Sequence, residues 1–313
     1  MDVAAMVERV LAGDRRAIAR AISMVEDDAP DLPELSRGLF ALTGRAHTVG
    51  LTGSPGVGKS SLAEQLVRAA RQRDRSVAVL AIDPTSPFTG GALLGDRLRM
   101  QTHATDPEVF IRSMATRGHL GGMALAAPEA IRILDAAGKD VIFVETVGVG
   151  QAEVQVASAA DTTLVVVSPG WGDSVQVSKA GILEIADVFV VNKADREGAG
   201  EAVRDLEVMI KMGPDLEWRP PVVRASATTG EGTDDLWEAI QSHRKHLDAS
   251  GGLDAKRRQR LAEEIEDMVA LRLRRRVATL LEGELSSLAD DVASRRIDPY
   301  EAADRLVESL GTT

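Results

Sequence analysis

One eight-residue run near the start of the chain restricts the fold more than any other feature. Residues 53–60 read Gly-Ser-Pro-Gly-Val-Gly-Lys-Ser, the complete G-x-x-x-x-G-K-[ST] pattern of a phosphate-binding loop. Residues 47–52 have the composition of a short buried strand, and the residues from Ser61 onward have the apolar spacing of a helix. This order of strand, loop and helix is the context in which the pattern binds a nucleoside triphosphate.

The residue types in this loop suit the chemistry of phosphate binding. Its glycines let successive backbone N–H groups converge on the phosphates, and the positive end of the following helix adds attraction. We expect Lys59 to reach the β- and γ-phosphate oxygens and the Ser60 hydroxyl to ligate Mg²⁺. The predicted nucleotide-binding residues here are Gly53, Ser54, Pro55, Gly56, Val57, Gly58, Lys59, Ser60 and Ser61.

The composition excludes several classes of protein. The chain has no cysteine, which excludes disulfides, thiolate metal sites and cysteine nucleophiles. A net charge of −11 argues against a broad nucleic-acid-binding surface, so we expect no nucleic-acid partner. No apolar run approaches the about 18 residues of a membrane span, and the first residues do not resemble a signal peptide. We therefore expect a cytoplasmic protein that does not bind membranes.

Short runs rich in valine and isoleucine alternate with segments of helical length. The runs are 77–82, 109–111, 141–144, 163–167, 188–191 and 222–223. This alternation predicts an α/β fold of the P-loop NTPase type, with a mostly parallel sheet flanked by helices. Helical spacing also predicts helical extensions at both ends of the chain.

We divide the chain into three parts. They are an N-terminal helical extension (1–45), a GTP-binding domain (46–249) and a C-terminal helical arm (250–313) that we expect to mediate dimerisation. A linker signal, Ser250-Gly251-Gly252, marks the second boundary. Basic clusters at 256–258 and 274–276 lie among acidic residues in this arm, and we interpret both as solvated faces of a helix.

Asn192-Lys193-Ala194-Asp195 predicts which base is bound. It directly follows the strand 188–191, at the end where ligands bind in open α/β sheets. The Asp195 carboxylate can accept hydrogen bonds from both N1–H and the 2-amino group of guanine, whereas adenine offers an acceptor at N1 and no amine at C2. The segment therefore favours GTP over ATP.

The remaining base contacts are expected from two neighbouring loops. Asn192 would brace these loops and contact the base edge, while the stem of Lys193 covers the ring. Farther along, Ser226 and Ala227 follow the strand 222–223 and fit a loop whose backbone N–H meets the guanine O6.

Acidic residues at the ends of interior strands are the candidate metal ligands. Asp83 closes the strand 77–82, and Glu145 closes the strand 141–144. Carboxylates at the ends of apolar strands require partners, and Mg²⁺ is the obvious one. Asp96 lies in a glycine-rich stretch that has the composition of a switch loop, and an ordinary loop aspartate is an equal alternative.

The segment Glu145-Thr146-Val147-Gly148 has the E-x-x-G form, in which the backbone N–H of Gly148 can sense the γ-phosphate. In many small G proteins a water-orienting glutamine directly follows that glycine. Here Val149 takes that position and Gln151 comes later. We therefore expect unassisted hydrolysis to be slow.

Together with further motifs, these residues closely resemble the MeaB/ArgK family, the G-protein chaperones of adenosylcobalamin-dependent acyl-CoA mutases. This family includes the human methylmalonic aciduria type A protein, and the resemblance covers nearly the whole chain. It implies a homodimeric, Mg²⁺-dependent GTPase that binds a mutase such as methylmalonyl-CoA mutase, gates the loading of its cofactor, and protects or reactivates it. The further motifs are Asp83-Pro84-Thr85-Ser86-Pro87, Thr89-Gly90-Gly91, Leu94-Gly95-Asp96, Arg99-Met100, Arg117-Gly118, Leu120-Gly121-Gly122 and Val147-Gly148-Val149-Gly150-Gln151.

The resemblance also implies roles for individual residues. Residues 169–179 look like an extra switch loop of the family, in which Asp173, Gln176 and Lys179 match the pattern. Lys179 and Arg99 are then candidates for stabilising charge at the γ-phosphate when the partner docks. The implied Mg²⁺ and switch network is Ser60, Asp83, Asp96 and Glu145. The candidate catalytic residues are Lys59, Arg99, Glu145 and Lys179.

Departures from the family pattern leave the partner open. They lie at 113–116, at 177–180 and at Ser61, so the partner stays open between methylmalonyl-CoA mutase and a relative of it, such as an isobutyryl-, 2-hydroxyisobutyryl- or ethylmalonyl-CoA mutase. The chain has no D-x-H-x-x-G cobalamin signature, so we expect the cobalamin to sit on the partner.

Three other functions stay open. A metallochaperone GTPase of the urease or hydrogenase maturation type needs a metal site, for which His243 and His246, on a helix face expected to be exposed, are the one close histidine pair. A kinase acting on a transport protein needs a base for a protein hydroxyl, and the sequence offers no candidate. A binding module without turnover is the third, because the hydrolytic residue is the least defined part of the site.

Overall fold

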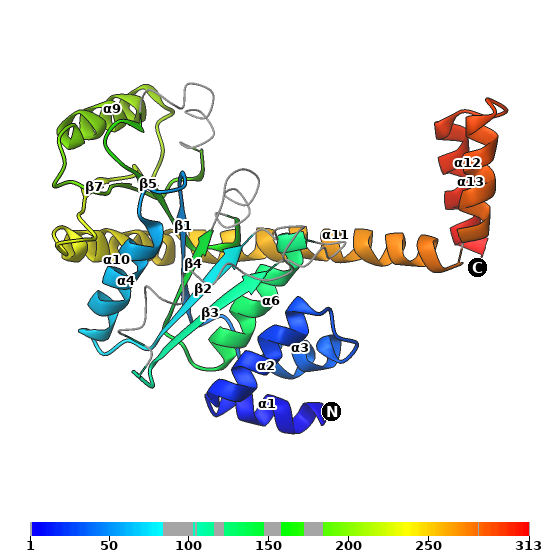
Figure 1. Ribbon diagram of the computed structural model, residues 1–313, viewed down its shortest axis with the longest axis horizontal. Helices are drawn as coiled ribbons and strands as arrows, with labels where there is room; N and C mark the ends of the chain where they lie inside the picture. The colour runs from blue at the N-terminus through cyan, green and yellow to red at the C-terminus, as the bar shows by residue number, and fades with distance from the viewer. Residues whose placement is uncertain are drawn as a thin grey trace. The chain divides into compact units, whose positions relative to one another are not determined.

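The computed structural model describes residues 2–83, 103, 105–115, 122–146, 158–171, 184–280 and 282–312. The chain forms two compact units, Met1–Arg260 and Leu261–Thr313. The first contains the sheet and the helices that cover it, and the second contains the rest of the C-terminal helical segment (Figure 1).

Seven strands within the described residues form one sheet in the order β3-β2-β4-β1-β5-β6-β7, and all neighbouring strands run parallel. The predicted parallel α/β fold of the P-loop NTPase type is confirmed, and the strand that precedes the phosphate loop lies at the centre of the sheet. The strands are β1 (His47–Thr52), β2 (Val77–Asp83), β3 (Val109–Ala115), β4 (Val141–Thr146), β5 (Thr162–Val167), β6 (Val188–Val191) and β7 (Val222–Arg224).

Helices bury both faces of the sheet, which is why most strand residues on both faces are apolar. Successive side chains of a strand point to opposite faces, so Val79 packs with α4 and α10 while Leu80 packs with α6 and the N-terminal helices. Helix α9 covers β5 and β6 on the same face as α6. The helices of the first unit are α1 (Val3–Leu11), α2 (Arg15–Glu26), α3 (Leu32–Phe40), α4 (Lys59–Arg71), α6 (Gly122–Ala136), α9 (Ala199–Met212), α10 (Thr233–Ser250) and the start of α11 (Gly252–Leu280).

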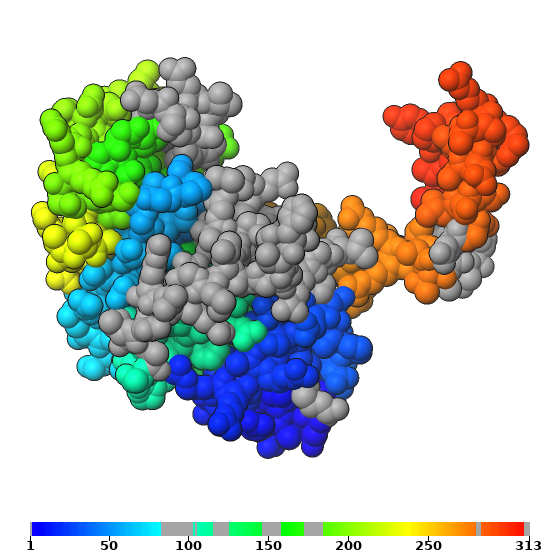
Figure 2. Space-filling model, in the orientation of Figure 1, coloured from blue at the N-terminus to red at the C-terminus, as the bar shows by residue number. Residues whose placement is uncertain are grey.

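The N-terminal helices share the core of the first unit. Ile18 and Ile22 of α2 are fully buried in the same apolar cluster as α6 and β2. Figure 2 shows the blue N-terminal residues directly against the green surface that includes β3. Arg112 in β3 pairs with Glu26 of α2 at 2.6 Å, so the charge of a strand residue is neutralised by this helix. The three-part division of the chain remains a prediction.

The second unit consists of most of α11 with α12 (Glu282–Ala293) and α13 (Pro299–Thr312), which pack on each other. Four apolar residues of α11 spaced four apart are 39–61% exposed: Leu261, Ile265, Val269 and Leu273. No described helix combines the length and apolar character that a membrane span requires.

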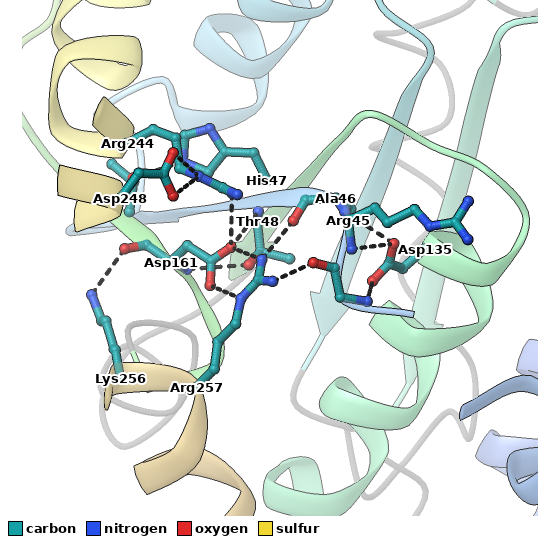
Figure 3. Close-up of polar contacts among 12 residues, drawn as sticks. Arg45, Ala46, His47, Thr48, Asp135, Asp161, Arg244, Asp248, Lys256 and Arg257 are labelled. Atoms are coloured by element: carbon teal, nitrogen blue, oxygen red, sulfur yellow. Dashed lines mark hydrogen bonds and ion pairs between the residues drawn. The ribbon is translucent and has the colours of Figure 1, made fainter. Parts of the chain in front are cut away.

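A buried ionic cluster fastens the start of α11 to the amino ends of β1 and β5 (Figure 3). Asp161 is fully buried and accepts hydrogen bonds from Arg257 (2.7 Å) and Arg260, with Arg244 of α10 at 3.7 Å. Burial raises the pKa of Asp161, but the hydrogen bonds and charges of Arg257 and Arg260 outweigh burial and hold the pKa well below its usual range. The carboxylate therefore stays ionised.

Arg257 also holds the segment that leads into β1. Its guanidinium donates to the carbonyl oxygens of Gly44 and Ala46, whose segment in turn donates backbone N–H groups to Asp135 of α6 (Figure 3). Arg257 was expected on a solvated helix face, and this prediction is wrong because the residue is partly buried against Asp161. Residues 274–276, the second basic cluster, are exposed as expected.

Candidate nucleotide-binding site

The phosphate loop lies at the carboxyl end of the central strand. β1 ends at Thr52, and α4 begins at Lys59 after Gly58, whose φ of 97° is in the left-handed region. The Lys59 side chain is buried, and its ammonium group donates to the carbonyl oxygens of Gly53 and Ser54 (3.3 Å to Ser54). The carbonyl oxygens of the loop therefore contact the ammonium group of Lys59, which was predicted to bind the phosphates.

Two loop glycines are required by close neighbours within the protein. A Cβ on Gly53 would lie 2.1 Å from the carbonyl oxygen of Val166 in β5, and one on Gly58 would lie 2.5 Å from Asn192 Nδ2. The φ angles of these glycines are 134° and 97°, which other residues rarely adopt. The sequence predicted these glycines only from the close approach of the backbone to the phosphates. The structure adds packing against β5 and the Asn192 loop.

Asn192 joins the phosphate loop to the loop after β7. It is buried, its amide nitrogen donates to the carbonyl oxygen of Val57 (2.8 Å), and its side-chain oxygen accepts from the N–H of Ala227 (3.1 Å). Its own N–H donates to Val167 of β5 (2.8 Å). One side chain thus sets the spacing between the loops expected to hold the phosphates and the base.

The next residues of this segment face outward. Lys193 has a φ of 59°, and its ammonium group donates to the carbonyl oxygen of Gly56 at 2.6 Å, so its stem crosses the phosphate loop. Asp195 is exposed. The neighbouring Ser226 hydroxyl and the backbone N–H of Asp195 itself lower the pKa of this carboxyl group, so it is an ionised acceptor at neutral pH.

Two of the predicted metal ligands end neighbouring strands. Glu145 is fully buried near the end of β4, in register with Leu51 of β1 and Ala81 of β2. The backbone of Asp83 ends β2, and its side chain lies outside the described residues. Together with the Ser60 hydroxyl at the start of α4, these residues offer the hard oxygen donors that Mg²⁺ prefers. The donor set therefore fits the ion.

Several predicted site residues lie outside the part of the chain that the structure describes: Asp96, Arg99, Gly148, Asp173, Gln176 and Lys179. Among the residues that are described, no group of three or more histidine, aspartate and glutamate side chains is arranged to hold a metal ion.

The histidine pair considered as the metal site of a metallochaperone, His243 and His246, includes one buried residue. His243 was expected on an exposed helix face, but it is 2% exposed and its ring centroid lies 4.9 Å from that of Trp218. Its Nε2 faces Asp187 at 3.3 Å, and its Nδ1 lies 2.9 Å from the Thr162 hydroxyl. This residue is therefore a satisfied core histidine.

The same network fixes the tautomers of two buried histidines. Because the Asp187 carboxylate lies 3.3 Å from His243 Nε2, it favours a proton on that nitrogen. The Thr162 hydroxyl then donates to His243 Nδ1 and accepts from His47 Nε2 at 2.8 Å. Burial lowers the pKa of His47 and of His243 to about 4 each. Sequence reasoning missed this network, whose one local signal is the polar run Asp161-Thr162-Thr163 at the start of an apolar strand.

Comparisons with known proteins agree with this geometry. The family model described as methylmalonyl Co-A mutase-associated GTPase MeaB matches residues 18–282. A protein of Pyrococcus abyssi named as a GTPase is 52% identical over 310 residues, covering 97% of this chain and 96% of the relative. The GTPase ArgK of Escherichia coli is 37% identical over 270 residues, covering 83% and 82%.

Two further similarities extend over nearly the whole chain. The mitochondrial methylmalonic aciduria type A homolog of Caenorhabditis elegans is 32% identical over 335 residues, covering 99% of this chain and 83% of the relative. A solved structure described as an LAO/AO transport system kinase has a TM-score of 0.73 and 26% identity, covering 99% of this chain and 97% of that one.

Proposed function

Because the chain belongs to the MeaB family of GTPases, we propose that it is the chaperone of an adenosylcobalamin-dependent acyl-CoA mutase. The activity given by the family is GTP hydrolysis, and the family name refers to association with methylmalonyl-CoA mutase. The observation that carries the proposal is the match of that family model to residues 18–282. In the proposed role, GTP turnover times the loading of the cofactor on the mutase and protects or reactivates it.

The nucleotide is proposed to lie across the carboxyl ends of β1 and β6. Asn192 supports this placement because it holds the phosphate loop and the loop after β7 at a set spacing. The ionised Asp195 would take the N1–H and 2-amino groups of guanine. The proposed nucleotide contacts are Gly53, Ser54, Pro55, Gly56, Val57, Gly58, Lys59, Ser60, Ser61, Gly148, Asn192, Lys193, Asp195, Ser226 and Ala227.

The proposed metal ligands are Ser60, Asp83, Asp96 and Glu145. Bound Mg²⁺ supplies neutralisation of the charge on the β- and γ-phosphates. Lys59 now contacts loop carbonyl oxygens and would contact phosphate oxygens instead when the nucleotide binds. Its positive charge would then lie beside the phosphate oxygens on which negative charge develops during hydrolysis. Lys179 and Arg99 are proposed to add positive charge when the partner docks, and the basal rate is expected to be slow because Val149 stands at the usual glutamine position.

A second copy of the chain is proposed to cover the apolar stripe of α11, defined by Leu261, Ile265, Val269 and Leu273. These side chains recur every four residues, so they share one face of the helix. The proposed homodimer is tested by light scattering of the wild-type protein and of Ile265→Glu. We expect a dimer that the substitution converts to a monomer; a monomeric wild-type protein would contradict the proposal.

The similar solved structure supports one alternative, since it is described as a transport system kinase. Phosphoryl transfer from labelled GTP or ATP to a solute-binding transport protein would favour that alternative. The metallochaperone alternative loses its candidate site, because His243 is buried among Thr162, Asp187 and Trp218.

The test of the main proposal is GTP hydrolysis by the purified protein with and without methylmalonyl-CoA mutase and each related mutase of the same genome. Lys59→Ala is the control for nucleotide-dependent turnover. We expect a slow basal rate that one mutase raises and that Lys59→Ala abolishes. Equal rates with and without every mutase would contradict the chaperone proposal while leaving the GTPase activity in place.

A further inference from the structure

The loop after β7 is held in a closed turn at the carboxyl edge of the sheet. The N–H of Ala225 donates to the carbonyl oxygen of Val191 (3.0 Å), and the N–H of Gly230 donates to the carbonyl oxygen of Ser226 (2.8 Å). These backbone bonds hold the two ends of the turn. The peptide groups on either side of Ala227, between those ends, are held by side chains.

The two side chains that hold Ala227 come from different elements. Asn192 Oδ1 accepts from the N–H of Ala227 at 3.1 Å, and Gln65 Nε2 donates to the carbonyl oxygen of Ala227 at 2.9 Å. The N–H and the carbonyl group belong to successive planar peptides around one Cα atom, so holding both restricts φ and ψ of Ala227. The direction of the Ala227 N–H therefore depends on Gln65 as well as on Asn192.

Gln65 lies on α4, the helix that begins with Lys59. Gln65 is six residues further along the helix than Lys59, which corresponds to about 9 Å along the helix axis. On either side of Gln65, Leu62 and Leu66 are fully buried in the core that α4 shares with the sheet and α10. The helix is thus a rigid body that carries the phosphate-binding lysine at its start and the brace for Ala227 about two turns later.

We propose that Gln65 is a positioning residue for guanine recognition. By holding the carbonyl group of Ala227, its amide fixes the position of this residue, so that the Ala227 N–H, which donates to Asn192 Oδ1, is shared with the guanine O6 in a three-centre hydrogen bond. This inference rests on the proposed placement of the guanine base at Ala227. Gln65 itself does not contact the nucleotide, so its removal speeds the loss of bound nucleotide and does not change the hydrolysis of GTP that remains bound.

The experiment measures dissociation of GDP and of 6-thio-GDP from the wild-type protein, Gln65→Met and Gln65→Glu. Methionine keeps the length of the side chain but has no donor, and glutamate at neutral pH presents only acceptors to the carbonyl oxygen. The sulfur of 6-thio-GDP is a weaker acceptor than O6, while N1–H and the 2-amino group are retained. Arg68→Ala, on the exposed side of α4, is the matched control.

We expect both Gln65 variants to release GDP about three- to tenfold faster than the wild-type protein, the range for one hydrogen bond between neutral groups. With 6-thio-GDP, the ratio of the release rates of variant and wild-type protein falls toward one. The rate of single-turnover hydrolysis of bound GTP stays unchanged. GDP release within 1.5-fold of wild type, or equal acceleration for both nucleotides, would overturn the inference. A wild-type protein that binds GDP but shows no contact between Ala227 and the base, by amide chemical shift, would instead contradict the proposed base site and with it this role of Gln65.

Discussion

Substitution of Asp161 by asparagine is expected to destabilise the first unit strongly. The carboxylate is fully buried and neutralises Arg257 and Arg260, so an amide in its place leaves two guanidinium groups facing a neutral side chain. Breaking a buried ion pair from one side costs about 3–5 kcal/mol. Since the two arginine side chains retain 20–23% exposure and can turn toward water, we place the loss near the lower limit, at about 3 kcal/mol.

This loss is large enough to measure in an ordinary unfolding experiment. At about 2–4 °C for each kcal/mol in a domain of this size, the midpoint of thermal unfolding falls by about 6–12 °C. The matched control is Asp248→Asn, because Asp248 pairs with Arg244 at 3.1 Å but is 53% exposed. Such an exposed pair contributes about 0.3–0.5 kcal/mol.

Urea unfolding followed by circular dichroism measures the loss of unfolding free energy for Asp161→Asn and for Asp248→Asn. The comparison holds when the dependence of the free energy on urea concentration is the same for all three proteins. A free-energy loss below about 1 kcal/mol for Asp161→Asn, equal to that of the control, would refute the assignment of this cluster as a structural anchor of α11.

Three further predictions follow from the site and its surroundings. Lowering the pH from about 6.5 to about 4 destabilises the protein by roughly 1.4 kcal/mol per pH unit for each of His47 and His243. In this range the two histidines bind protons in the unfolded chain but stay neutral when buried in the folded protein. Urea unfolding midpoints at pH 7 and at pH 4.5 test this. Gly58→Ala lowers the unfolding free energy of the nucleotide-free protein more than Gly56→Ala does, because both carry left-handed strain but a Cβ at 58 also meets Asn192, whereas one at 56 meets nothing within 4 Å; equal losses in chemical denaturation would contradict this. Asp195→Asn weakens GDP binding by at least tenfold, since the amide cannot accept from both N1–H and the 2-amino group, and it improves binding of xanthosine diphosphate, whose C2 carbonyl can accept from the new amide; nucleotide titration calorimetry measures both.

The fold follows largely from local signals in the chain. Valine-rich runs between helical segments mark buried parallel strands, and the phosphate loop marks the turn between β1 and α4. The predicted strand at 109–111 extends to Ala115, because Arg112, which ended the apolar run, finds its partner Glu26 on α2. A polar residue in a strand is thus tolerated when an element distant in sequence satisfies it.

The sequence by itself determined the kind of site, because phosphate binding and guanine recognition depend on residue types at short, fixed spacings that also fix their place at the ends of strands. The order of the strands, and the contacts of Asn192 with Val57 and of Gln65 with Ala227, join segments that are 135 and 162 residues apart. Likewise, Arg257 reaches a carboxylate 96 residues away, and His243 is buried by Trp218 and β5 rather than exposed. Only the tertiary structure decided these features, because contacts between distant segments leave no periodic signal in the chain, and the burial of a charged or polar side chain depends on which partner the fold brings to it.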